Sequence, residues 1–104
     1  MANYLLVYKG GGMGDTPEEQ QKVMQAWMAW FGGMGPAVVD GGNPCGPSRT
    51  IKSGGAVAEG GASALSGYSV IKADSLDEAT KLAKGCPVLA GNGSVEVYET
   101  FNAM

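Results

Sequence analysis

Histidine is absent from this chain of 104 residues. Its absence excludes Ser-His and Cys-His nucleophilic machinery, the commonest general base, and most zinc and non-haem iron sites. An enzyme with this sequence would have to use acids, tyrosines, thiols, lysines or its single arginine. We therefore expect neither a cofactor nor a metal centre.

Basic clusters and long hydrophobic runs are lacking as well. Seven bases and ten acids give a formal charge of −3, and the bases are scattered, which argues against nucleic acid or an anionic membrane as a partner. The apolar run at residues 4–8 is too short for a signal peptide or for the ~20 residues of a membrane span. Two cysteines, Cys45 and Cys86, are too few for a disulfide scaffold. We expect one cytoplasmic domain over residues 1–104.

Glycine is abundant, with 18 of 104 residues. Glycine raises the conformational entropy lost on folding, so this chain needs stabilisation beyond a small core. Oligomerisation is one ordinary source of that stabilisation.

The hydrophobic pattern predicts two halves that each read strand, capped helix, strand. The expected strands cover residues 4–8, 37–39, 66–72 and 95–99. Capping boxes begin the helices at Thr16 and Ser75, Gly32-Gly33 end the first helix, and Gly85 caps the second. Residues 49–59 form a small hairpin that turns at 53–55.

This order predicts an α+β fold of the ferredoxin-like β-α-β-β-α-β type: a four-stranded antiparallel sheet with both helices on one face, plus the inserted hairpin. The first helix carries a buried stripe of Val23, Trp27, Trp30 and Met34, widened by Met24, Ala26 and Phe31. The stripe of the second helix is Leu76, Ala79, Leu82 and Ala83.

Both faces of the first strand are apolar. Alternation places Leu5 and Val7 on one face and Tyr4, Leu6 and Tyr8 on the other, yet two helices cover only one face. A bare apolar sheet face is larger than soluble monomers usually expose. We therefore expect a homodimer in which two such faces pack together.

Several segments resemble the YCII-related family, which includes the group named for its D-G-P-F motif. The likeness lies in the sequence L-S-G-Y-S-V-I-K-A-D-S-L-D-E-A-T-K-L-A-K-G-C-P at 65–87, G-S-V-E-V-Y-E-T-F at 93–101, Q-A-W-M-A-W-F at 25–31 and V-V-D-G-G at 38–42. The resemblance implies a dimeric α+β barrel, as in muconolactone isomerases and cofactor-independent monooxygenases.

Some members of that family carry a His-Asp pair proposed as catalytic, in a cleft between helix and sheet. Here the histidine has no counterpart, and Asp40 is the nearest match for the acid. E-G-G-A-S at 59–63 stands in place of the D-G-P-F motif. These two differences weaken the expectation that this chain shares the activity of the family, whereas the fold that the resemblance implies is unaffected.

The segment 38–50 holds most of the candidate site residues. Asp40 follows a strand and precedes two glycines, so it is either a proton acceptor or an Asp that closes a turn. Cys45 is either a thiolate activated by Arg49 or a small buried residue, the interpretation we also give to Cys86. Ser48 and Arg49 could hold a carboxylate or enolate oxygen, or could simply lie at the base of the hairpin.

Aromatic residues supply the other candidates. Trp27 shares a helix face with Trp30, as core packing or as the wall of a substrate cleft. Tyr8 and the other tyrosines either pack in the dimer face or donate hydrogen bonds from their hydroxyls into a cavity. The run 10–14, G-G-G-M-G, lacks the ending of a phosphate loop and is interpreted as a flap beside the first helix.

Three functions stay open: a homodimer that binds a small organic ligand between helix and sheet, a cofactor-free isomerase, lyase or oxygenase-type enzyme with Asp40 as proton acceptor, and a purely structural or interaction module.

Overall fold

The computed structural model describes residues 1–12, 14–61 and 63–103. It is an α+β domain whose elements follow one another as β1 (Ala2–Lys9), α1 (Pro17–Met34), η1 (Gly35–Ala37), β2 (Val38–Asp40), β3 (Arg49–Ile51), β4 (Val57–Glu59), β5 (Leu65–Ala73), α2 (Leu76–Ala83), η2 (Pro87–Gly91) and β6 (Ser94–Glu99), where η marks a 3₁₀ helix.

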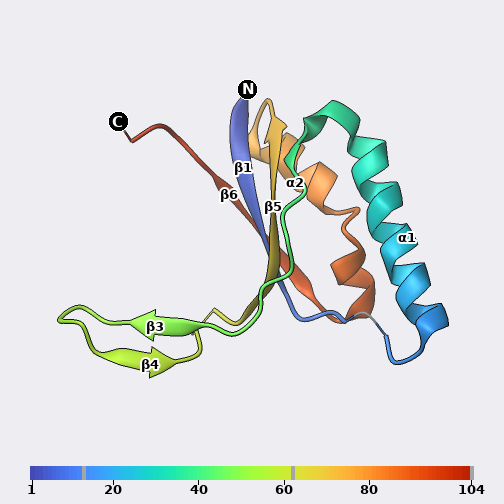
Figure 1. Cartoon of the computed structure of the whole chain (residues 1–104). Coiled ribbons are helices and arrows are strands. Elements are labelled where there is room, and N and C mark those ends of the chain that lie inside the picture. Colours follow the sequence, from blue (N-terminus) through green and yellow to red (C-terminus); the bar gives the residue numbers. More distant parts are fainter. Residues whose placement is uncertain (13, 62, 104) are drawn as a thin grey trace.

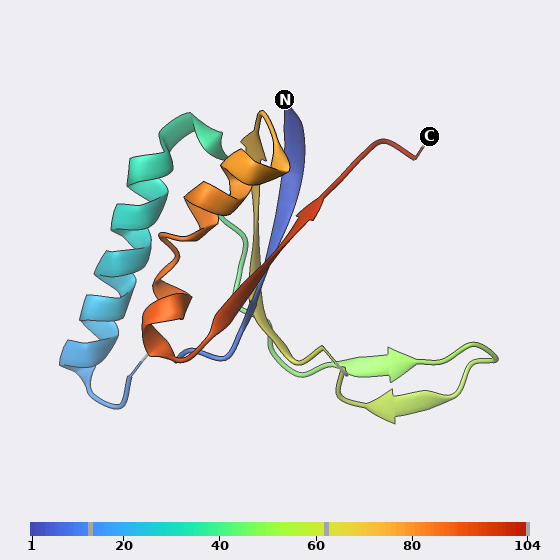
Figure 2. The same cartoon turned by 180° about the vertical axis from the view of Figure 1, so that it is seen from behind.

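Four strands form an antiparallel sheet in the order β2-β5-β1-β6, and both helices lie on the same side of it (Figures 1 and 2). The two long central strands, β1 and β5, pair along almost their whole length, from Ala2 with Ala73 to Lys9 with Leu65. The predicted four-stranded antiparallel sheet with its two helices is therefore confirmed.

The alternation predicted for β1 is also confirmed. Tyr4, Leu6 and Tyr8 point toward the helices and are buried in the core, together with Ile71 of β5. Leu5 and Val7 lie on the opposite side, which no helix covers. Each side of the sheet thus has its own set of apolar residues.

Side-chain caps start the helices where the sequence placed them. The hydroxyl of Thr16 accepts a hydrogen bond from the Glu19 N–H at 3.1 Å, and that of Ser75 accepts one from the Glu78 N–H at the same distance. The Glu19 carboxylate in turn accepts from the Asp15 N–H at 2.8 Å.

The helix ends differ from the prediction. α1 continues through Gly32-Gly33 to Met34, because the buried Met34 side chain anchors the last turn in the core, and Gly35, at φ +54°, ends the helix. α2 ends at Ala83 with Lys84 as its C-cap residue, and Gly85, which follows directly, does not have the positive φ of a left-handed glycine cap.

The helical stripes are only partly buried. Ala79 and Ala83 of α2 reach the core, but Leu76, the first residue of the helix, is 46% exposed. On α1, all of whose residues are described, Met34 alone is buried, whereas Trp27 and Trp30 are half-buried. α1 therefore stands off from the sheet over much of its length.

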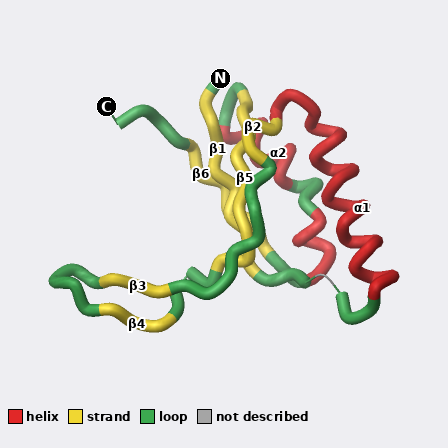
Figure 3. Tube along the Cα trace, viewed as in Figure 1, coloured by secondary structure: helices red, strands yellow, loops and turns green. Residues whose placement is uncertain are grey.

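The hairpin of β3 and β4 projects from the domain as an arm (Figures 1 and 3). Its predicted turn is confirmed, with the Gly55 N–H bonded to Lys52 O and positive φ at Gly54 and Gly55. The Cα radius of gyration is 15.1 Å, above the roughly 13 Å expected for a compact domain of this length.

Candidate functional site

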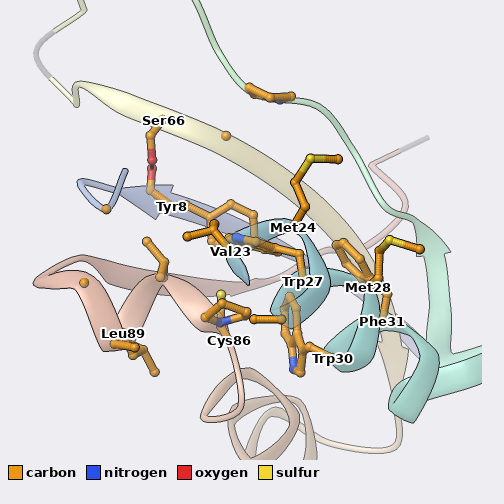
Figure 4. A pocket seen from close by; sticks show the side chains of 18 of the residues that line it. Tyr8, Val23, Met24, Trp27, Met28, Trp30, Phe31, Ser66, Cys86 and Leu89 are labelled. Atoms are coloured by element: carbon orange, nitrogen blue, oxygen red, sulfur yellow. Dashed lines mark hydrogen bonds between the residues drawn. The ribbon is translucent and has the colours of Figure 1, made fainter. Parts of the chain in front are cut away.

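A cleft of about 1270 Å³ opens where α1 stands off from the sheet, and we call it the helix–sheet cleft. Its walls come from α1, from the glycine-rich segments after β1 and β2, from β5 and from η2 (Figure 4). Ligand pockets usually measure about 300–1,000 Å³ and are mostly apolar. The cleft is therefore large enough for a small organic molecule with room to spare.

Aromatic rings form the apolar wall of the cleft. Tyr8 contacts Trp27 edge to face, with ring centroids 4.9 Å apart, and Trp27 contacts Trp30 in the same way at 5.6 Å. Phe31 lies against Trp30 at 5.1 Å (Figure 4). Edge-to-face packing fixes the rings with respect to one another, so the wall is preformed.

Trp30 also connects α1 to α2 through a hydrogen bond. Its indole N–H donates to the Leu82 carbonyl of α2 at 2.9 Å. The ring lies directly over Gly85, where a Cβ would come within 3.1 Å of the indole. A Cβ at position 85 would press against the indole, which accounts for a glycine at the end of α2 that is not a left-handed cap.

The polar groups on the floor of the cleft are already bonded to the protein. The Tyr8 hydroxyl donates to Ser69 Oγ at 2.7 Å, and Ser69 Oγ donates to Gly41 O at 2.7 Å. Ser66 Oγ lies 3.1 Å from Tyr8 O and 3.0 Å from Gly10 O. A ligand lying on this floor would meet few unpaired hydrogen-bonding groups.

Burial keeps the two titratable groups at the floor neutral. It raises the pKa of Tyr8 to about 12 and the pKa of Cys86 to about 11. A neutral thiol is a poor nucleophile, so Cys86 has the properties of an apolar wall residue. The sequence-based interpretation of Cys86 as a small buried residue is confirmed.

Of the residues predicted to form a site, Tyr8 and Trp27 lie in this cleft. Asp40, at the end of β2, is exposed, and its carboxylate accepts a hydrogen bond from the Gly42 N–H at 2.8 Å, which closes the turn. Its side chain is not among the described groups that line the cleft.

The other predicted residues lie toward the arm. Ser48 Oγ accepts from the Gly61 N–H at 2.8 Å, and Arg49 pairs with Glu59 at 3.5 Å across the hairpin. Cys45 is exposed, so its interpretation as a buried residue is wrong. The stiff Pro44–Pro47 segment carries it along the edge of the sheet, where Pro44 bridges to Gly67, instead of into the core. Asp40, Cys45, Ser48 and Arg49 are not among the described residues that line the helix–sheet cleft with Tyr8 and Trp27.

Several residues of the cleft had no strong sequence signal. η2 brings Val88 against Gly11, where a Cβ would come within 2.9 Å of the valine methyl. The only hint was Pro87 after the second helix, followed by the glycines at 91 and 93. Of the predicted flap at 10–14, residues 10–12 border the cleft, and Met13 lies outside the described residues.

Within the described residues, no group of three or more acidic or thiol side chains is placed to hold a metal ion. No helix in the described part combines the length and apolar character needed to cross a membrane. No protein-family model matches this sequence, and no curated protein matches it.

Proposed function

We propose that this protein is a ferredoxin-like, YCII-related homodimer that binds a small, mainly apolar organic molecule in the helix–sheet cleft. The observation that carries the proposal is the preformed aromatic wall of Tyr8, Trp27, Trp30 and Phe31 beside a cleft of about 1270 Å³. The exposed apolar surface of the half-buried tryptophans is unfavourable in water, and a bound apolar ligand would remove that surface from solvent.

The strand order supports the ferredoxin-like part of the proposal. Two β-α-β halves interleave so that β1 and β5 are central, and α1 and α2 share one side.

The uncovered side of the sheet supports the homodimer. Leu5, Tyr68 and Val70 are half-buried there, and Tyr98 is 51% exposed. A second copy is the simplest cover for this face.

Binding fits the geometry better than proton transfer by Asp40. The Asp40 carboxylate is bonded within its own turn and does not border the aromatic wall, so a ligand in the cleft would not contact it. If turnover of some substrate were found and Asp40→Asn abolished it without loss of stability, the enzymatic alternative would replace the proposal.

The ligand site is tested by titration with the neutral apolar fluorophore N-phenyl-1-naphthylamine. Trp27 and Trp30 are the only tryptophans in the chain, so energy transfer from them reports binding in the cleft. We expect Trp27→Leu to weaken binding up to about tenfold, since contact with one aromatic ring contributes roughly 0.5–1.5 kcal/mol beyond the area that it buries.

The matched control is Phe101→Leu, which removes an 85% exposed ring that lies after β6 and outside the lining of the cleft. It should leave the affinity unchanged. Equal loss in both variants would place the probe outside the cleft, and an absence of binding to the unmodified protein would refute the proposed function.

A further inference from the structure

The charged side chains among the described residues that line the helix–sheet cleft are all positive. Lys22 on α1 and Lys84 at the end of α2 border it, and no Asp or Glu occurs among its described lining residues. The whole chain carries ten acids and seven bases, so the positive charge of this lining is opposite in sign to the net charge of the protein. Within the described residues neither lysine forms an ion pair, since the ion pairs there join Lys9 to Glu96 and Arg49 to Glu59.

The lining of the cleft is mostly apolar, and its uncharged polar side chains include Tyr8, Asn43, Ser66 and Tyr68. The hydroxyls of Tyr8, Ser66 and Ser69 and the indole N–H of Trp30 are bonded within the protein. Burial raises the pKa of Cys86 to about 11, so no thiolate adds negative charge there. A ligand can therefore place an apolar body inside without losing hydrogen bonds, whereas its own polar group has to face the rim.

We propose that the natural ligand is an amphipathic organic anion: a rigid apolar ring system that lies against the aromatic wall, with one carboxylate or similar acidic group directed toward Lys22 and Lys84. This inference rests on the proposed ligand-binding function and adds the charge of the ligand. Lysine attracts an anion as a flexible point charge. Because both lysines are exposed, their effect is modest and sensitive to salt.

Two probes that differ by a single acidic group provide the test. 1-Anilinonaphthalene-8-sulfonate carries a sulfonate, and N-phenyl-1-naphthylamine is the same ring system without it. We expect the unmodified protein to bind the sulfonate probe severalfold more tightly at low salt. The difference should shrink toward zero as the ionic strength approaches 1 M, where the Debye length is about 3 Å.

The variant Lys22→Gln/Lys84→Gln should weaken the sulfonate probe about threefold to tenfold, the range expected for two exposed charge pairs, and leave the neutral probe within twofold. Lys52→Gln/Lys81→Gln is the control, because it removes the same two positive charges from exposed positions outside the lining of the cleft. Its affinity for both probes should equal that of the unmodified protein.

Equal affinity of the unmodified protein for the two probes would overturn the anionic ligand while leaving the proposed binding function intact. An effect of Lys52→Gln/Lys81→Gln as large as that of Lys22→Gln/Lys84→Gln would do the same, because it would show that the net charge of the protein, and not a local site, attracts the sulfonate. Binding of neither probe would refute the proposed function itself.

Discussion

The Tyr8 hydroxyl donates a hydrogen bond of 2.7 Å to Ser69 Oγ, and both side chains are buried between the sheet and α1. The Ser69 hydroxyl in turn donates a hydrogen bond to Gly41 O at 2.7 Å. A single buried serine therefore connects β1, β5 and the turn that follows β2, and it fixes the floor of the helix–sheet cleft.

Ser69→Ala should lower the free energy of unfolding by about 2 kcal/mol, because it leaves the buried Tyr8 hydroxyl without an acceptor and Gly41 O without a donor. Tyr8→Phe should cost only about 1 kcal/mol, since Ser69 keeps its bond to Gly41. Urea unfolding followed by circular dichroism measures both values. A smaller loss in Ser69→Ala than in Tyr8→Phe would contradict this connection.

Gly42→Ala should destabilise the protein severely, by about 3 kcal/mol or more, because overpacking adds to backbone strain at a positive φ. Gly42 has φ +74°, and a Cβ there would lie 1.7 Å from the Tyr68 carbonyl oxygen, a backbone atom that cannot move aside.

Gly41→Ala is the matched control for that substitution. No atom lies within 4 Å of a Cβ at Gly41, and its φ is outside the left-handed region. The change in its free energy of unfolding should stay within about 0.5 kcal/mol. Comparable midpoints of thermal unfolding for the two alanine variants would show that the turn adapts.

The two thiols should react at very different rates. Cys45 is exposed and Cys86 is buried, so a disulfide reagent at pH 8 should modify one thiol at once and the second only as the protein unfolds. Cys45→Ser should remove the fast phase and leave the slow one. Two fast phases in the unmodified protein would contradict the buried position of Cys86.

Stability should fall as the pH rises above 9. Cys86 has a folded pKa of about 11 against its ordinary 9.0, and Tyr8 about 12 against 10.0, so the folded state holds both protons more tightly. The resulting stabilisation is complete below pH 9 and is lost progressively between pH 9 and 12. Cys86→Ala should remove the contribution of Cys86 to this decline, most clearly between pH 9 and 10, below the ordinary pKa of Tyr8, as measured by urea unfolding at each pH.

The proposed dimer should dissociate when a charge is placed on the uncovered side of the sheet. Val70 lies opposite Leu5 on that side, and Val70→Lys should weaken association by roughly 100-fold or more, as expected for an unpaired charge buried in an interface. Sedimentation equilibrium measures the dissociation constant.

Val57→Lys makes the same substitution on the exposed arm and should leave that constant unchanged. A monomeric unmodified protein would refute the dimer. If Val57→Lys caused dissociation and Val70→Lys did not, the interface would lie on the arm and not on the sheet.

The sequence by itself determined the elements, because their signals are local. Thr16 and Ser75 cap their helices through bonds to residues three positions on, and alternation in β1 assigns Tyr4, Leu6 and Tyr8 to one side. The turn at Gly54-Gly55 follows from glycine's access to positive φ. The end of α1 was mispredicted because a buried Met34 outweighs the cost of two helical glycines.

Only the tertiary structure decided where the cleft lies. Asp40, Cys45 and Arg49 are close in sequence, yet the chain carries them along the edge of the sheet and into an arm, whereas Tyr8, Trp27 and Val88 meet from distant segments. Several glycines are likewise explained by their distant neighbours: Gly42 by Tyr68, Gly85 by Trp30 and Gly11 by Val88. These contacts join segments that are far apart in the sequence, so they depend on packing across the whole domain, which no local pattern encodes.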